Sequence, residues 1–85
     1  MTVEVYSKTS CIQCTQSKKK LEQLGVEYVE TDIFENPEAY KFVTETLKFR
    51  AAPVIVVKNA DGTISDAWSG FNPEKIEAVA QSVSV

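Results

Sequence analysis

The sequence has no histidine and only two cysteines, Cys11 and Cys14, among its 85 residues. Structural zinc is held by four Cys or His ligands, so a single chain lacks the ligands for such a site. Two cysteines are also too few for a disulfide framework, and their spacing closes a loop too short to restrict the unfolded chain much. Neither a zinc domain nor a disulfide-stapled domain is expected.

Glycine and proline are scarce as well, with three of each. Together with 44% apolar and 25% charged residues, this is the composition of a folded globular chain and not of a disordered or collagen-like one. No window approaches the roughly 18 apolar residues of a membrane span, and the N-terminus has no basic start followed by an apolar stretch. We therefore expect neither membrane insertion nor secretion, and a cytoplasmic location.

An excess of positive charge is also absent, since the net charge is -3 and the pI is near 4.9. Nucleic-acid binders need a basic face, so this class of partner is not expected. The run Lys18-Lys19-Lys20 is interpreted as the solvated side of a helix. A chain of this size builds one modest core, and we expect a single domain over residues 1–85 that acts as a monomer.

The N-terminal half predicts a strand, a helix and a second strand. Valine alternating with polar residues predicts a half-buried strand over residues 2–6. A helix over residues 12–24 ends at Gly25, which suits the left-handed stop of a helix. Its buried face is predicted to comprise Cys14, Ser17, Leu21 and Leu24. Residues 26–33 form the second strand, which a right-handed crossover makes parallel to the first.

The C-terminal half predicts a helix, a hairpin and a last helix. Asn36-Pro37 and Asn72-Pro73 each mark a helix start, because Asn accepts a hydrogen bond from a free N–H and Pro fits the first helical position. The buried faces are predicted to comprise Tyr40, Phe42, Val43 and Leu47 in one helix and Ile76, Val79, Ala80 and Val83 in the other. Residues 54–57 predict a central strand, with residues 63–68 as its hairpin partner. This α/β order, βαβαββα, with a four-stranded mixed sheet flanked by three helices, resembles the thioredoxin fold.

Cys11 and Cys14 lie where the first strand leads into the first helix. A thiol at a helix N-terminus faces unpaired N–H groups and the positive end of the macrodipole, which favour its thiolate. We therefore expect Cys11 to be the nucleophile of thiol–disulfide exchange. Cys14 follows nearly one helical turn later and is less exposed, so we expect it to be the resolving thiol. A metal ion or iron–sulfur cluster shared between two chains is the alternative for this pair.

Four other residues are candidates for the site. Pro53 precedes the central strand, and the fold predicts a cis peptide bond there that presents the Ala52 backbone to an extended partner segment. Lys8, in the loop before Cys11, either favours the thiolate or is a solvated loop lysine. Trp68 either contributes to partner docking or packs in the core.

Two stretches carry a family resemblance. Cys11-Ile12-Gln13-Cys14 has no proline between its cysteines, and Trp68-Ser69-Gly70-Phe71-Asn72-Pro73 is similar to the motif Trp-Ser-Gly-Phe-Arg-Pro. These stretches resemble the NrdH-redoxins within the glutaredoxin branch of the thioredoxin superfamily, and the likeness extends over essentially the whole chain. Partner contacts are predicted at Lys8, Ile12, Gln13, Ala52, Pro53, Trp68, Ser69, Gly70 and Phe71.

The resemblance also implies partners. NrdH-redoxins take electrons from NADPH through thioredoxin reductase and pass them to a class Ib ribonucleotide reductase, so we expect thioredoxin reductase and the large subunit of ribonucleotide reductase as partners, with no bound cofactor. A glutathione-dependent glutaredoxin is the alternative. Such proteins usually carry Cys-Pro-Tyr-Cys and a Gly-Gly-(Cys/Ser)-Asp segment that holds the glutathione carboxylate at a helix start. Here Phe71 crowds a glycine position and Asn72-Pro73 replaces donors, so glutathione binding should be weak.

Overall fold

The computed structural model describes residues 2–83, with side chains through residue 82. Its elements follow in the order β1 (Thr2–Ser7), α1 (Ile12–Gln23), β2 (Val29–Asp32), α2 (Pro37–Lys41), η1 (Phe42–Thr46), β3 (Val54–Lys58), β4 (Ile64–Ser69) and α3 (Pro73–Val83). The short segment η1 is a π-helical turn that continues α2. The predicted order βαβαββα is confirmed.

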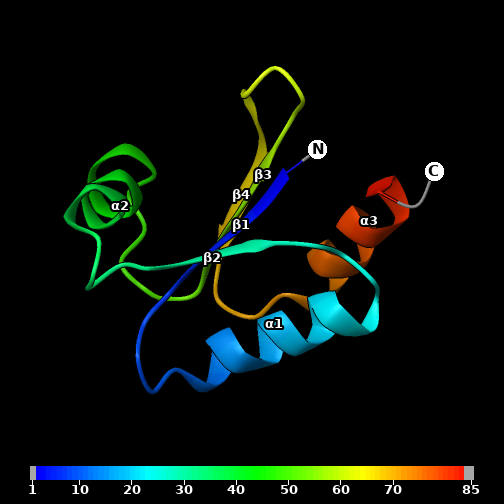
Figure 1. The fold of residues 1–85 in the computed structure, drawn as a ribbon, viewed down its shortest axis with the longest axis horizontal. Helices are drawn as coiled ribbons and strands as arrows, with labels where there is room; N and C mark the ends of the chain where they lie inside the picture. Colours follow the sequence, from blue (N-terminus) through cyan, green and yellow to red (C-terminus); the bar gives the residue numbers. More distant parts are fainter. Residues whose placement is uncertain (1, 84–85) are drawn as a thin grey trace.

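The four strands form one mixed sheet in the order β2-β1-β3-β4. β1 is parallel to β2 and antiparallel to β3, and β3 is antiparallel to β4. Helices α1 and α3 cover one face of the sheet and α2 covers the other (Figure 1). This is the predicted thioredoxin-like arrangement, and it leaves β1 and β3 in the middle of the sheet.

Side chains of the central strands alternate between two cores. The core under α1 and α3 includes Val3, Val5, Ile55, Val57, Trp68 and Ile76. The core under α2 includes Tyr6, Ile33, Ala39, Val43, Val54 and Val56. Because β3 contributes to both cores, all four residues of the apolar run at 54–57 are buried, as that run predicts.

The predicted helix boundaries are confirmed by their hydrogen bonds. Gly25 has a φ of 74°, and the N–H groups of Gly25 and Val26 donate to the carbonyls of Glu22 and Leu21, the pattern of a Schellman stop. Asn36 accepts from the Ala39 N–H at 3.1 Å, and Asn72 accepts from the Lys75 N–H at 3.2 Å. None of the described helices combines the length and apolarity that crossing a membrane requires.

The second strand and two buried faces differ from the prediction. β2 spans Val29–Asp32 and not residues 26–33, because the parallel register with β1 begins only where Glu4 pairs with Val29. Leu24 is 37% exposed, since it lies at the end of α1 beyond its last buried turn. Tyr40 is 45% exposed, because Ala39 and Val43 fill the face toward the sheet. Phe42 and Leu47 are partly buried against that core, and the side chain of Val83 lies outside the described residues.

Candidate redox site

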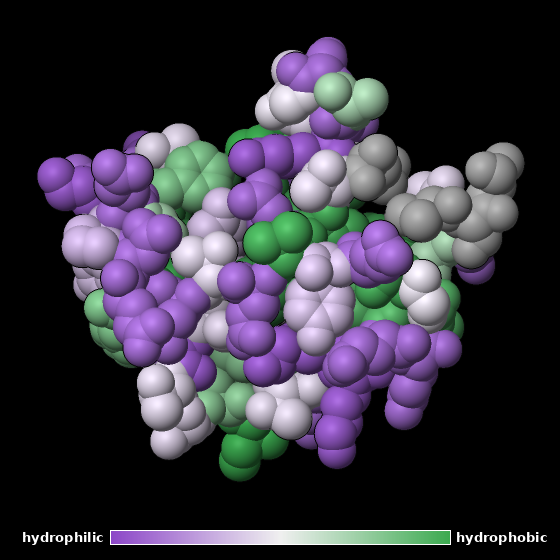
Figure 2. Space-filling view, viewed as in Figure 1, coloured by the Kyte–Doolittle hydropathy of each residue, from purple (hydrophilic) through white to green (hydrophobic). Residues whose placement is uncertain are grey.

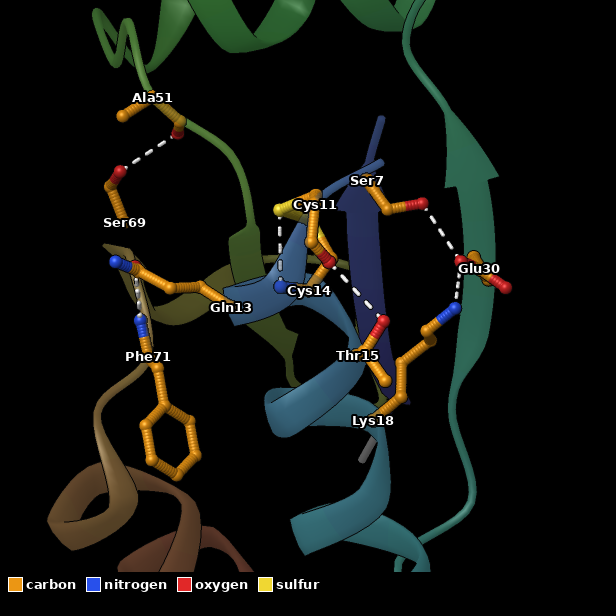
Figure 3. Close-up of a disulfide and its surroundings, with 10 residues drawn as sticks. All are labelled: Ser7, Cys11, Gln13, Cys14, Thr15, Lys18, Glu30, Ala51, Ser69 and Phe71. Carbon is orange, nitrogen blue, oxygen red and sulfur yellow. Dashed lines mark hydrogen bonds and ion pairs between the residues drawn. A yellow bond between two sulfur atoms is a disulfide. The ribbon is translucent and has the colours of Figure 1, made fainter. Parts of the chain in front are cut away.

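Cys11 and Cys14 form a disulfide at the junction of β1 and α1 (Figure 3). Their Cα atoms are 5.2 Å apart. Cys11 is the N-cap residue of α1, and its Sγ accepts a hydrogen bond from the Cys14 N–H at 3.1 Å. The sulfur of Cys11 therefore takes the position that a side-chain oxygen takes in most helix caps, beside the positive end of the helix.

The two sulfurs differ in exposure. Cys14 is 2% exposed and shares the buried face of α1 with Ser17 and Leu21, whereas Cys11 is partly exposed. Cys11 is therefore the more accessible residue of the pair, and Cys14 is the less exposed one, as expected. Among the described residues, no three His, Cys, Asp or Glu side chains are grouped to hold a metal ion.

The loop before β3 is tied to the loop after β4. The Ala52-Pro53 peptide bond is cis, as predicted. The Gly70 N–H donates to the Pro53 carbonyl at 2.8 Å. The Ser69 hydroxyl donates to the Ala51 carbonyl at 2.8 Å, as Figure 3 shows. Ala52 lies between these two anchored carbonyls and is half-buried, so its backbone is held in place without being paired in the sheet.

The loop after β4 is also tied to the helix that carries the cysteines. The side chain of Gln13 extends from α1 toward this loop, and its Oε1 accepts a hydrogen bond from the Phe71 N–H at 3.2 Å (Figure 3). Gly70 has a φ of 84°, a conformation that side chains disfavour. A Cβ at Gly70 would lie 3.3 Å from the same Gln13 oxygen, so the Gln13 side chain would have to shift slightly, and it is the backbone conformation that favours glycine here.

The family follows from comparison with known proteins. The protein-family model described as Glutaredoxin matches residues 3–60. The chain belongs to the glutaredoxin family. Its cysteine pair at the start of α1 is accordingly that of a thiol–disulfide oxidoreductase.

Named relatives of this glutaredoxin-family protein include NrdH proteins. The glutaredoxin-like protein NrdH of Lactococcus lactis subsp. cremoris is 40% identical over 78 residues, which are 92% of this chain and 99% of that protein. The protein of the same name from Salmonella typhimurium is 32% identical over 79 residues, which are 89% of this chain and 85% of that protein. The solved NrdH-redoxin of Escherichia coli superposes with a TM-score of 0.81 at 26% identity, over 93% of this chain and 95% of that one. This glutaredoxin-family protein is thus NrdH-like.

The predicted contact residues divide into surface and core positions. Ile12, which precedes Gln13 in α1, is 78% exposed, and Phe71, whose N–H Gln13 binds, is 36% exposed. Lys8 is exposed beside the cysteines. Trp68 is only 5% exposed and belongs to the core under α1 and α3, so the packing alternative is confirmed. Trp68 supports the loop after β4 from inside the protein and does not itself offer a surface to a partner.

Sequence reasoning missed a polar cavity of about 520 Å³ beside the disulfide of this glutaredoxin-family protein. Its walls include Cys11, Cys14, Ser7, Lys18 and Glu30. The Ser7 hydroxyl and the Lys18 ammonium donate to the same Glu30 oxygen, at 2.8 and 2.7 Å (Figure 3). The hydrogen bond from Lys18, and then that from Ser7, lowers the pKa of Glu30, while Glu30 raises the pKa of Lys18.

The second missed feature is a cavity of about 390 Å³ that Ala51 and Ala52 help to line. It is lined by Lys8, Ile33, Phe34, Tyr40, Val43, Thr44, Phe49, Arg50, Ala51 and Ala52. The rings of Phe34 and Tyr40 are 6.2 Å apart, and both residues are exposed. The sequence signal for this cavity was the pair Phe34 and Tyr40, two aromatic residues six positions apart on either side of a helix start. Only the fold brings them beside the loop that contains Ala52.

Glu30→Gln should lower the stability of the protein slightly and only where Glu30 is ionised. The pKa of Glu30 is below its ordinary 4.5 in the folded protein, so its stabilisation is present above that value and is lost as the pH falls through the lowered pKa. Because both side chains are partly solvated, the free energy of unfolding should fall by less than about 1 kcal/mol at neutral pH. Urea unfolding, followed by the fluorescence of the single tryptophan, measures this difference.

The matched control is Glu27→Gln, which removes an exposed carboxylate from the loop before β2. This control should leave the stability of the protein nearly unchanged at both neutral and acidic pH. A difference between wild type and Glu30→Gln that does not diminish as the pH falls through the lowered pKa of Glu30 would contradict the electrostatic account, because protonation removes the charge on which the stabilisation depends.

Proposed function

We propose that this protein is a dithiol–disulfide reductase that receives electrons from NADPH through thioredoxin reductase and reduces a protein disulfide of the large subunit of a class Ib ribonucleotide reductase. The observation that carries the proposal is the cysteine pair, with Cys11 capping α1 and Cys14 buried behind it. The 40% identity to the NrdH protein of Lactococcus lactis supports the choice of partners. So does the thioredoxin-like activity profile described for the NrdH-redoxin of Escherichia coli.

The chemical cycle uses one thiol after the other. In the reduced protein, the Cys11 thiolate attacks a sulfur of the partner's disulfide, forming a mixed disulfide and releasing the partner's other sulfur as a thiolate. The Cys14 thiol then loses its proton and attacks the Cys11 sulfur, which forms the internal disulfide and releases the partner's second thiolate. Two electrons pass to the partner, whose two thiolates take up the proton released by Cys14 and a second proton from solvent. Thioredoxin reductase restores the dithiol with two electrons from NADPH.

The helix start supports this order of attack. The Cys14 N–H that donates to Cys11 Sγ at 3.1 Å is a donor for a thiolate on Cys11, and the positive end of α1 acts in the same direction. Cys14 has no comparable position, since it lies inside the helix and is shielded from solvent. The partner reaches the exposed sulfur first, and the buried sulfur completes the exchange.

The neighbouring backbone supports docking of a protein partner. Ala52 lies in the loop whose flanking carbonyls, those of Ala51 and Pro53, are anchored to the loop after β4. An extended segment of the partner would pair with the Ala52 backbone while its disulfide lies over Cys11. Ile12 and Phe71 then flank the docked segment. A reducing cytoplasm suits this chemistry, and each step uses one chain, so we place the protein there as a monomer.

A coupled assay of NADPH oxidation tests the proposal. One reaction contains thioredoxin reductase, and the other contains glutathione and glutathione reductase, each with the same oxidised large subunit of a class Ib ribonucleotide reductase as electron acceptor. We expect faster turnover with thioredoxin reductase. Faster turnover with glutathione would instead support the glutathione-dependent alternative. A variant with both cysteines replaced by serine provides the blank.

A further inference from the structure

Gln13 connects the redox helix to the start of the last helix. It stands between the two cysteines in the sequence, yet its side chain turns away from them toward Phe71 (Figure 3). Its Oε1 accepts from the Phe71 N–H at 3.2 Å, across 58 residues of sequence. This contact satisfies a backbone donor of the segment immediately before α3.

The start of α3 is a place where anions bind in many proteins, because its first N–H groups have no partner within the helix. Here two side chains of the protein accept hydrogen bonds in this region, one from the first turn of α3 and one from the segment just before it. Asn72 Oδ1 accepts from the Lys75 N–H at 3.2 Å, and Gln13 Oε1 accepts from the Phe71 N–H. Glu74 adds a negative charge to the first turn of α3. A ligand carboxylate that binds here must displace a side-chain acceptor of the protein, and the negative charge of Glu74 repels it.

We propose that Gln13 is a specificity-determining residue that discriminates against glutathione by occupying the Phe71 N–H. This inference rests on the proposed function and explains its choice of electron donor. Glutathione carries its own carboxylates and depends on such donors, whereas an extended protein segment pairs with the Ala52 backbone and needs no donor from Phe71. The net value of one hydrogen bond corresponds to a factor of about 3 to 10 in affinity.

On the face drawn in Figure 2, hydrophilic and hydrophobic residues lie side by side, so the polarity of that face gives no basis for such discrimination. The hydrogen-bond donors around the start of α3 give such a basis. Gln13 is exposed, and its amide oxygen is held only by the Phe71 N–H among the described residues. Replacing this side chain therefore changes one hydrogen bond and leaves the core intact.

Gln13→Met tests the inference, since methionine has a similar length and no strong acceptor. The kcat/KM measured with glutathione and glutathione reductase is divided by the kcat/KM measured with thioredoxin reductase. This ratio should be about 3- to 10-fold higher in Gln13→Met than in wild type, through a lower KM for glutathione. S-methylglutathione, which cannot exchange thiols, should shift the NMR signal of the Phe71 amide in Gln13→Met more than in wild type. S-methylcysteinylglycine, which lacks the γ-glutamyl carboxylate, should shift the Phe71 signal no more in Gln13→Met than in wild type.

Two variants serve as controls. Gln13→Glu keeps an acceptor for Phe71 and adds a like charge, so glutathione should gain nothing. Gln16→Met removes an exposed amide from the same helix and should change neither the ratio nor the Phe71 signal. The inference is overturned if Gln13→Met leaves both readouts unchanged, or if turnover with both donors falls together at a constant ratio, which indicates a purely structural role. The NMR titration needs no reductase, so it decides this point even if thioredoxin reductase fails to reduce the wild-type protein.

Discussion

Cys11→Ser is expected to abolish the disulfide reductase activity, with a loss of at least about 10³-fold in kcat/KM. Serine keeps the helix cap, because its oxygen can accept the N–H hydrogen bond that Sγ accepts from Cys14. The fold should therefore persist while the nucleophile is missing. Turnover in the coupled NADPH assay and the circular dichroism spectrum of the same sample separate loss of chemistry from loss of structure.

Cys14→Ser should have a different result, because the first attack still occurs. The mixed disulfide between Cys11 and the partner then accumulates, since no internal thiol remains to resolve it. The sequence has only these two cysteines, so mass spectrometry of the trapped complex identifies the bond without ambiguity. A stable mixed disulfide formed by Cys11→Ser, and not by Cys14→Ser, would reverse the proposed roles of the two thiols.

The features that local chemistry determines were predictable from the sequence. Gly25 ends α1 and Asn36 and Asn72 begin their helices because each forms its cap with neighbouring backbone groups. The junction of β1 with α1 follows from the change of apolar spacing around residue 11. These rules need no knowledge of distant contacts, so they suffice to place the cysteines at the start of a helix.

The buried face of the second helix was predicted less well, because the predicted face included Tyr40 and left out the small side chain of Ala39. The π-helical turn η1 (Phe42–Thr46) follows directly after α2. Tyr40 precedes this turn, and Ala39 lies four residues before Val43, so ordinary helical spacing places Ala39 and Val43 on the same face. Ala39 and Val43 therefore face the sheet, while Tyr40 lies outside near Phe34.

Contacts between distant segments were beyond sequence reasoning. The Gln13 side chain meets the Phe71 N–H only because α1 and the start of α3 lie on the same face of the sheet (Figure 1). Ser7 reaches Glu30 because β1 and β2 pair in a particular parallel register. Gln13 and Phe71 were predicted as contact residues from two separate motifs. Neither motif indicates that the Gln13 side chain accepts a hydrogen bond from the Phe71 backbone.

Ile76→Ala should have the largest effect on stability among the substitutions considered. Ile76 is 0% exposed and belongs to the core between α3, α1 and the sheet. Removing a buried isoleucine side chain down to alanine costs about 2–5 kcal/mol, from the lost burial and the cavity that remains. Small domains are stable by about 5–15 kcal/mol in total, so the variant should lose a large part of its stability. The midpoint of urea unfolding, followed by tryptophan fluorescence, measures this loss.

Ile64→Ala is the matched control, because the same atoms are removed from a side chain that is 43% exposed on β4. Its unfolding midpoint should move much less, since water already contacts part of this side chain and little cavity remains. Equal shifts for the two variants would contradict the described packing of α3.

The same two variants also test the connection between the core and the redox site, because α3 begins just after Phe71, whose N–H is hydrogen-bonded to Gln13. If Ile76 anchors α3 as described, Ile76→Ala should weaken protection of the Phe71 amide from hydrogen exchange, whereas Ile64→Ala should leave it unchanged.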